Sequence, residues 1–429
     1  MMKKSTRDVL VVGFALFAIF FGAGNLIFPP TLGIVGGQEW WKSTLGFLVT
    51  DPLLPILGII ATIRVGGQAD DLGKRISPKF SAFLAAVCML AIGPFFSVPR
   101  TAATTHEIAT IQIFPNMPVW VTTVLFFALT LWLALNPSRA MDRIGKILTP
   151  ALLVALTILI VGSFFYPDSA MAVRKPQNFF LIGFREGYQT MDALGAALMS
   201  GIAITHLISC GYDSTKERNR MALRSGIVAF ILLAYVYAGL SFMGARLSSH
   251  FAIGTDRTIV LLESVRLLFG KPGALILGAG VSLACLTTSV GLTVACGNYF
   301  DQLTKGKLPY QKVVIISTLF SFFVSLLGVE GIIKSAVPVL QMAYPVMIVL
   351  IVLTFFDRHI RSPWTYTGAV IGAFAVSALE TIGSLFGGMG SLVDALKALP
   401  FGNVGMEWLL PAAVLSLLCT IVARLGKKA

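Results

Sequence analysis

The sequence has few charged residues for its length. Only 12% of its 429 residues are Asp, Glu, Lys or Arg, whereas 56% are hydrophobic. A soluble domain carries roughly a quarter charged residues, because water has to solvate its surface. This shortage excludes a soluble globular protein. The apolar residues instead form repeated runs of about 20, the length that spans a bilayer as a helix, and they predict a polytopic membrane protein.

Histidine and cysteine are also scarce, and neither forms a catalytic or metal-binding pattern. The four histidines are far apart and match no HExxH-type spacing: His106, His206, His250 and His359. The five cysteines lie in or beside apolar runs, which indicates small packing residues and no disulfide framework. No ring-forming filter repeat of a channel is visible. The sequence therefore predicts that the protein is not an enzyme, and it disfavours a channel.

A block of basic residues that would bind nucleic acid is also lacking. The net charge of +13 comes from Lys and Arg scattered through short loops. If the N-terminus lies inside, about two-thirds of these basic residues fall on the inner side, as the positive-inside rule requires. We therefore expect a bacterial inner-membrane protein with both termini cytoplasmic, in contact with lipid, with no nucleic-acid partner and no obligatory protein partner. No cleavage site follows the first apolar stretch, so it is predicted to be a span and not a signal peptide.

Twelve apolar segments are separated by short loops that carry Gly, Pro and charge. The predicted spans are residues 8–31, 42–63, 80–98, 118–136, 146–166, 187–210, 224–246, 273–299, 312–328, 333–356, 364–386 and 407–425. The fold class is therefore an all-α polytopic membrane protein of about twelve transmembrane helices. Within this single domain we expect a first block of five spans (8–166), a second block of five (187–356) and two additional helices (364–425).

The first and sixth spans are both interrupted. The first contains FGAGNLIFPP (residues 21–30), and the sixth reads YQTMDALGAALMSGIAI (residues 188–204). Glycine can simply allow close helix packing in membranes. Two interruptions that lie five spans apart, however, indicate an inverted repeat of five plus five helices in which helices 1 and 6 are discontinuous. In such transporters the substrate binds at the breaks.

A helix that is broken within the membrane exposes polar backbone groups. The amide end of the second half carries a positive partial charge that suits a carboxylate, and the carbonyl end of the first half suits a cation or an ammonium group. Bare backbone of this kind is tolerated only where it lines a cavity. Gly22 and Gly24 lack a side chain, so a ligand can approach the main chain closely. The pattern predicts a site for a zwitterion, such as an α-amino acid with an apolar side chain.

Three motifs together resemble a known family of membrane carriers. They are FGAGNLIFPP, GPFFSVPRTAATTHE (residues 93–107) and ACLTTSVGLT (residues 284–293). They are similar to the bacterial branched-chain amino acid:cation symporters, the BrnQ-type carriers, and the likeness covers nearly the whole chain. It implies import of leucine, isoleucine and valine by alternating access, with Na⁺ or H⁺ as the coupling ion. More distantly, the architecture resembles the sodium-coupled leucine transporter. The alternative is a carrier on the same fold for another amino acid or small zwitterion.

The resemblance also implies substrate-binding residues at both breaks. The GxGN pattern of the wider fold matches residues 22–25, and it implies that the amides of Ala23 and Gly24 receive the substrate carboxylate. Two roles are open for Asn25: a place beside the substrate or cation, or satisfaction of backbone groups that the break frees. The complete expected set is Gly22, Ala23, Gly24, Asn25, Gln189, Thr190, Asp192 and Ala193.

A sodium site is implied on the eighth span. The Ala-x-x-Ser/Thr-Ser/Thr pattern of the wider fold falls on Ala284, Thr287 and Thr288, whose helical spacing places their oxygens on one face. The carbonyls of Ala18 and Phe21 would complete an oxygen-only site that suits a hard cation. Two alternatives are open: the threonine hydroxyls bond back to their own helix, or the site is shifted by one residue to Cys285, Thr288 and Ser289.

Acidic residues inside spans are rare and are functional candidates. Asp192 has three possible roles: binding the substrate ammonium, carrying a coupling proton, or capping the second half of the broken helix. Asp51 is predicted to cap a kink ahead of Pro52. Glu380 is expected to lie outside the ten-helix core, in packing or a subunit contact.

Three further predictions concern the shape of the pathway. Arg100 and His106 are expected near the outer mouth. Pro94 and Phe95 are candidates for an apolar wall of the pocket. The segment Phe28–Pro30 is predicted to end the second half of helix 1 at the outer surface.

Overall fold

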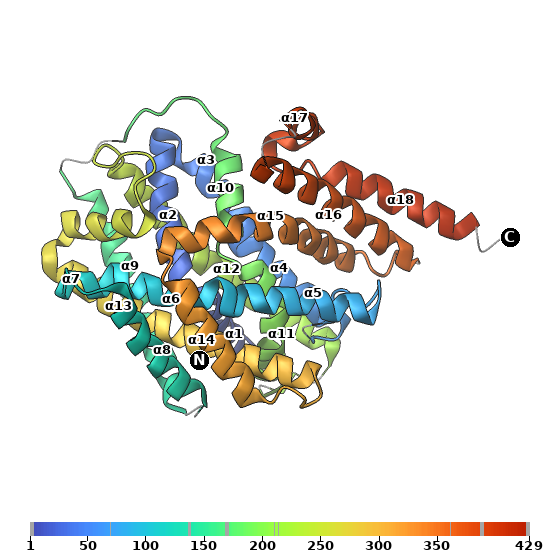
Figure 1. Ribbon diagram of the computed structural model, residues 1–429, viewed down its shortest axis with the longest axis horizontal. Helices are drawn as coiled ribbons and strands as arrows, with labels where there is room; N and C mark the ends of the chain where they lie inside the picture. The colour runs from blue at the N-terminus through green and yellow to red at the C-terminus, as the bar shows by residue number, and fades with distance from the viewer. Residues whose placement is uncertain are drawn as a thin grey trace.

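The protein is built entirely from helices in the part that the structure describes (Figure 1). This computed structural model describes residues 4–425 apart from residues 69, 136–138, 168–170, 210, 213, 361 and 387–389. Within that part, six helical stretches are long and apolar enough to cross a membrane, and four shorter apolar helices accompany them. Each apolar segment predicted from the sequence overlaps one of the helices.

The first five predicted spans correspond to three interrupted helices followed by two continuous ones. The first is split into α1 (Lys4–Phe20) and α2 (Ala23–Gly36), the second into α3 (Trp40–Leu48) and α4 (Leu54–Val65), and the third into α5 (Pro78–Leu90) and α6 (Ser97–Thr105). The continuous helices are α8 (Val119–Leu135) and α9 (Arg139–Phe164). Short helical elements connect or extend these helices: η1 (Gly37–Glu39), η2 (Val49–Leu53), η3 (Ala91–Phe95), η4 (His106–Thr110) and α7 (Ile111–Ile113).

The second block begins with another split helix. Its halves are α10 (Phe179–Tyr188) and α11 (Asp192–Ser209), and they are followed by α12 (Thr215–Arg246), α13 (Arg257–Leu303), α14 (Tyr310–Ser325) and α15 (Gly328–Phe355). A bend at Gly270, where φ is 67°, separates a first segment of α13 from the long apolar remainder. Glycine is suited to this position because residues with a side chain rarely adopt a positive φ.

The two blocks pack on each other reciprocally. Both halves of the first broken helix, α1 and α2, contact α12, which is the second long helix of the other block. Both halves of the second broken helix contact the second helix of the first block, since α10 packs on α3 and α11 packs on α4. This exchange is the relation expected for an inverted repeat, and it places the two breaks on neighbouring helices.

The remaining helices form a separate pair at one side of the bundle (Figure 1). Helices α16 (Pro363–Phe386) and α18 (Leu409–Leu425) pack on each other, and α16 also packs on α15. Between them lie α17 (Gly390–Lys397) and η5 (Gly402–Val404). A small apolar cluster joins the pair to α15, with Leu350, Tyr366 and Trp408 among its buried members.

An ion pair ties two loops together at one end of the bundle. Arg75, between α4 and α5, donates to Asp357, between α15 and α16, at 2.8 Å. Tyr366 donates to the same carboxylate at 2.8 Å. Burial tends to raise the pKa of Asp357, but these two hydrogen bonds stabilise its charged form and hold the pKa below the ordinary value.

Several boundaries predicted from the sequence are wrong, and two of them are wrong for the same physical reason. The sixth span begins at Phe179 instead of residue 187, and the third helix continues past residue 98 as far as Ile113. Both missed segments contain charged residues, which lower a hydropathy average. The structure pairs these charges inside the protein: Glu186 contacts Arg257 at 2.7 Å, and Arg100 bonds to backbone carbonyls.

The prediction that Phe28–Pro30 ends a half-helix at the surface is also wrong. These residues are buried within α2, which continues to Gly36. Proline fits a helical φ, although inside a helix it removes one amide hydrogen bond and its ring crowds the carbonyl four residues earlier. The Thr31 hydroxyl donates to the Ile27 carbonyl at 3.2 Å, and packing against α12 holds the segment in place. The carbonyls that lose an amide partner to the two prolines are those of Asn25 and Leu26, and membrane helices tolerate proline where the surrounding protein compensates for this loss.

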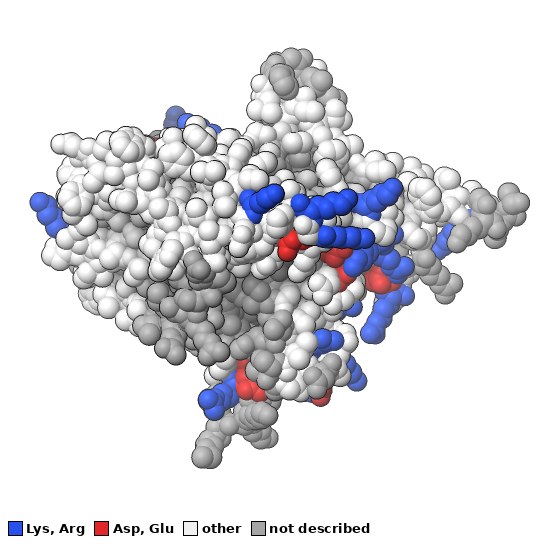
Figure 2. Space-filling view, turned by 60° about the horizontal axis from the view of Figure 1, so that its bottom comes forward, with Lys and Arg blue, Asp and Glu red and all other residues white. Residues whose placement is uncertain are grey.

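The surface agrees with a protein surrounded by lipid. Figure 2 shows a broad face almost free of charge, with Lys, Arg, Asp and Glu gathered along one side. Many large apolar side chains are exposed; for example, Leu125 is 67% exposed and Trp132 is 62% exposed. In water this much apolar surface would cause association, whereas in a bilayer it faces hydrocarbon chains.

We predict that glycine is required where α2 crosses α12. A Cβ atom on Gly244 would overlap the Pro30 carbonyl group, so Gly244→Ala forces the helices apart. We expect a loss of about 1–3 kcal/mol, the usual effect of overpacking, seen as a lower melting temperature in detergent. Gly291→Ala is the matched control, because nothing lies within 4 Å of that position. Equal melting temperatures for the two variants would contradict the prediction.

Candidate functional site

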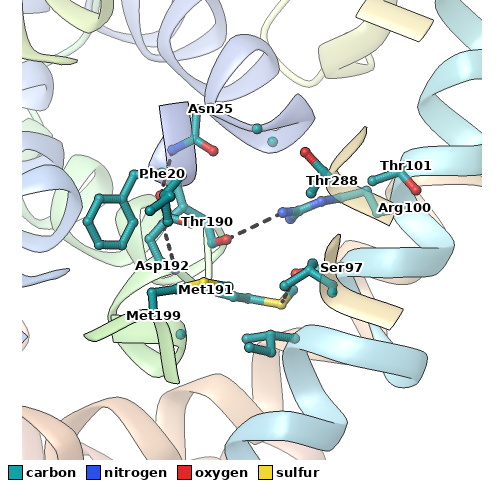
Figure 3. Close-up of a pocket in the computed structure, with 16 residues that line it drawn as sticks. Phe20, Asn25, Ser97, Arg100, Thr101, Thr190, Met191, Asp192, Met199 and Thr288 are labelled. Atoms are coloured by element: carbon teal, nitrogen blue, oxygen red, sulfur yellow. Dashed lines mark hydrogen bonds between the residues drawn. The ribbon is translucent and has the colours of Figure 1, made fainter. Parts of the chain in front are cut away.

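The breaks in the two discontinuous helices face a common cavity (Figure 3). The first break lies between Phe20 and Ala23, and the second lies between Tyr188 and Asp192. A cavity of about 60 Å³ separates them. Of the residues predicted from the sequence, those that line it are Gly22, Gly24, Asn25, Thr190, Asp192 and Thr288.

The four backbone ends at the two breaks are not equivalent. At the start of α11, the amides of Leu194 and Gly195 both donate to the Met191 carbonyl, at 3.1 and 3.2 Å. At the start of α2, Gly22 has an extended backbone and supplies no side-chain cap. The first amides of α2 are therefore available to an anion, and the helix dipole favours one there.

Arg100 occupies the carbonyl end of α10, which corrects its predicted position at an outer mouth. Its side chain is only 4% exposed, and its guanidinium donates to the Gln189 carbonyl at 2.6 Å and reaches the Thr190 carbonyl at 3.5 Å. A cation at this end satisfies freed carbonyls and complements the helix dipole. A Cβ atom on Gly24 would lie 2.5 Å from the guanidinium, so glycine there also makes room for Arg100.

Asn25 links three neighbouring helices. Its side-chain nitrogen lies 3.0 Å from Asp51 Oδ2, 2.8 Å from Asp192 Oδ2 and 2.6 Å from Tyr237 Oη. Asn25 is 2% exposed and Asp51 is fully buried, whereas Asp192 is partly exposed and lines the cavity. The amide of Asn25 is therefore engaged with side chains, and not with the backbone groups freed by the break.

Neither intramembrane aspartate has the capping role considered for it. The Asp192 carboxylate accepts from Asn25, while the first amide of α11 donates to the Thr190 hydroxyl at 3.5 Å. Asp51 does lie at a kink before Pro52, with φ −153° and ψ 113°. Its carboxylate nevertheless accepts from Asn25, and its Oδ1 atom has no hydrogen-bond partner in the described part of the chain.

The other residues expected at the second break are Gln189, Thr190 and Ala193, and of these three Thr190 lines the cavity. The Thr190 hydroxyl donates to the Gly187 carbonyl at 2.8 Å. Gln189 is buried with an unpartnered Oε1, and Ala193 is fully buried; neither lines the cavity. Ala23 contributes the first residue of α2.

The expected sodium ligands lie on α1 and α13. Thr288 faces the first break, with its hydroxyl oxygen 3.8 Å from the Cβ position of Gly22. The Thr287 hydroxyl donates to the Ala284 carbonyl at 2.9 Å, which is the bond to its own helix considered above. Ser289 of the alternative register faces away, toward Thr130 at 3.3 Å. Ala18 and Phe21 lie at the end of α1 and directly after it.

Sequence reasoning missed the apolar wall of the cavity. That wall is made by Ile19, Ile92, Met191, Met199 and Leu292. Pro94 and Phe95, the predicted wall residues, do not line the cavity, and Phe95 packs on Phe320 instead. Methionine is a flexible side chain that adapts to aliphatic ligands of different shape. An unbroken apolar run gives no signal for which of its residues face a cavity.

Ion pairs join three helices near the cavity. Arg257, the first residue of α13, contacts Glu186 of α10 and Glu330 of α15, both at 2.7 Å. The Phe28 ring connects this cluster to the cavity, because both Arg257 and Arg100 lie 5.5 Å from its centre. Glu380 lies on α16, outside the ten-helix core as predicted, and it contacts Arg185 of α10 at 2.9 Å.

Comparison with known proteins places the sequence among amino-acid carriers. Residues 5–426 match a family described as branched-chain amino acid transport protein. The chain is 37% identical to the branched-chain amino acid permease BraB of Bacillus subtilis (strain 168), covering 96% of this chain and 95% of that protein. It is 38% identical to the branched-chain amino acid transport system 3 carrier protein of Pseudomonas aeruginosa, covering 99% and 98%.

Solved transporters share the fold at low sequence identity. An inward-facing conformation of Mhp1 matches with a TM-score of 0.62 and 14% identity, covering 96% of this chain and 91% of that one. MhsT in complex with L-phenylalanine matches with a TM-score of 0.57 and 18% identity, covering 96% and 98%. The predicted all-α fold, of the type found in the sodium-coupled leucine transporter, is thereby confirmed.

We predict that Arg100 stabilises the second break. Arg100→Gln keeps a donor but cannot reach both carbonyls, and leaving one buried carbonyl unsatisfied costs about 1–3 kcal/mol. The melting temperature in detergent should therefore fall by several degrees. Arg224→Gln is the matched control, because Arg224 is exposed on α12. If Arg100→Gln melts at the wild-type temperature, the guanidinium does not hold the break.

Proposed function

Because the chain belongs to the branched-chain amino acid transport protein family, it is a membrane carrier of these amino acids and not an enzyme, and we propose that it imports leucine, isoleucine and valine together with a cation by alternating access. The observation that carries this proposal is the cavity between the two helix breaks. Its walls contain the uncapped amides of α2 for an anion, the Asp192 carboxylate for a cation and apolar side chains for an aliphatic group.

The substrate carboxylate binds the uncapped amides of α2, at Ala23 and Gly24. The extended backbone of Gly22 and the absence of a side-chain cap support this assignment. The ammonium group binds Asp192, whose carboxylate lines the same cavity. The branched side chain then lies against the wall formed by Ile92, Met199 and Leu292, where burial of each methylene group contributes about 0.8 kcal/mol.

Sodium is the coupling ion that the residues favour, and it binds between α1 and α13. The proposed ligands are oxygens of Ala18, Phe21, Ala284, Thr287 and Thr288. Thr288 reaches the first break beside Gly22, and the Thr287 hydroxyl keeps free lone pairs while it donates to Ala284. Such a set of neutral oxygens suits a monovalent hard cation. A proton is the alternative coupling ion.

We place the carrier in the bacterial inner membrane with both termini in the cytoplasm. The excess of Lys and Arg in the loops on that side supports this orientation. The loops that contain Arg75 and Asp357 then face the cytoplasm, and the cluster of Glu186, Arg257 and Glu330 faces outward. In this orientation the cluster closes the outer entrance, since it bridges α10, α13 and α15 across the Phe28 ring.

The proposed transport cycle predicts saturable leucine uptake into proteoliposomes when an inward sodium gradient is imposed. Replacing external sodium by choline at fixed pH should reduce leucine accumulation several-fold, because the cation no longer contributes its gradient. Radiolabelled leucine measures the uptake. Leucine uptake that is not saturable, or that ignores both sodium and proton gradients, would contradict the proposal.

Thr288 provides a direct test of the cation site. Thr288→Ala removes one oxygen ligand, so the sodium concentration that gives half-maximal leucine uptake should rise about tenfold, equivalent to about 1.4 kcal/mol. Thr288→Ser is the matched control, because it keeps the hydroxyl, and it should remain near the wild-type value. An unchanged sodium curve for Thr288→Ala would remove this residue from the site.

A further inference from the structure

Asp51 is a buried acid that the proposed substrate and sodium sites do not use. It lies on the kink between α3 and α4 and is 0% exposed. Its Oδ2 atom and Asp192 Oδ2 approach the same nitrogen of Asn25, at 3.0 and 2.8 Å. The cavity reaches Asp192 but not Asp51. Two carboxylates, one from each block of helices, therefore meet directly behind the cavity.

Among the described residues, the groups in contact with this pair are neutral hydrogen-bonding side chains, and none of them is a cation. The Asn25 nitrogen carries two hydrogens but has three oxygen contacts, since Tyr237 Oη also lies 2.6 Å away. Asp51 Oδ1 is buried and unpartnered, and neither carboxylate forms an ion pair with a Lys or Arg in the described part of the chain. Two adjacent buried negative charges without a cation in direct contact are strongly unfavourable.

We propose that Asp51 and Asp192 form a proton-binding pair that holds one proton and carries it with the substrate. Carboxylates that share a confined site cannot both ionise, so one of them retains a proton. A metal ion fits poorly, because the N–H groups of Asn25 point at the carboxylate oxygens and would repel a cation placed between them. A proton needs only the oxygens themselves.

The groups around the pair give its two members different roles. Asp192 lines the cavity together with Arg100, whose positive charge attracts the Asp192 carboxylate. Asp51 is fully buried behind Asn25, and the hydroxyl of Tyr237 of α12 lies 2.6 Å from the same Asn25 nitrogen. The proton therefore resides on Asp51, which becomes neutral, and Asp192 stays ionised.

This inference rests on the proposed function, because the ionised partner is the residue that receives the substrate ammonium. When the ammonium arrives at Asp192, the proton stays on Asp51, and no covalent bond changes. The net charge at the pair is then zero: one ammonium, one carboxylate and one neutral carboxyl group. When the site opens to the other side and the substrate leaves, the proton leaves Asp51 as well.

The test uses proteoliposomes with equal sodium on both sides and an acidic exterior. We expect the wild-type protein to accumulate radiolabelled leucine several-fold and to acidify a pH dye trapped in the lumen when leucine is added. Asp51→Asn, which cannot release a proton, should lose both responses. It should still exchange leucine for leucine in counterflow, which needs no driving ion and reports a folded carrier. Asp394→Asn on the exposed face of α17 is the matched control and should behave as the wild type.

The outcomes separate the two proposals. Accumulation by Asp51→Asn equal to that of the wild type overturns the proton pair. So does a wild-type protein that ignores the pH gradient but still responds to a sodium gradient, which would leave the proposed function intact. If Asp51→Asn also loses counterflow, the test depends on leucine-dependent acidification of the lumen by the wild type. Absence of this acidification overturns the proton pair, and its presence supports the pair. Absence of leucine counterflow in the wild type would instead overturn the proposed function.

Discussion

The whole site depends on one constraint: a membrane protein has to satisfy, from its own atoms, every polar backbone group that a helix break sets free. The second break meets this requirement internally. The Asp192 amide donates to the Thr190 hydroxyl, and the amides of Leu194 and Gly195 donate to the Met191 carbonyl. The Arg100 guanidinium takes the two carbonyls that directly follow α10. The amide end of α2 has no cap of this kind. The backbone is therefore most open to an anion at Gly22, on the side of the cavity where Thr288 also lies.

The same constraint explains why the surrounding residues are small or polar. Gly24 lets Arg100 lie against α2, and Gly244 lets α12 approach the Pro30 carbonyl. Close approach of this kind brings Tyr237 of α12 within reach of Asn25. Small residues at the helix crossings thus allow polar groups from distant parts of the chain to meet, and hydrogen bonds between them have no competing water in the apolar interior.

Local patterns in the sequence predicted the elements that depend on local chemistry. Glycines and prolines mark the first break, and Asp192 marks the second, so the discontinuous helices followed from the residue pattern. The six predicted residues that line the cavity followed from the family resemblance at those breaks and on the eighth span. The position of Arg100 could not be predicted in this way, because its partners lie 89 and 90 residues further along the chain. The same holds for Asp51, which meets Asn25 only because α3 and α2 fold together. Charges that are paired internally also concealed the start of α10, since a hydropathy average counts them as exposed.

The size of the cavity shows how substrate binding has to be linked to movement. A volume of about 60 Å³ admits only a few water molecules, whereas leucine has nine non-hydrogen atoms. Leucine can therefore enter only if a wall moves. The ion pairs of Arg257 hold α10, α13 and α15 together on one side, and Asn25 holds α2 to both aspartates on the other. A ligand that places its ammonium on Asp192 competes with Asn25 for that carboxylate, so binding itself weakens a contact between the two broken helices.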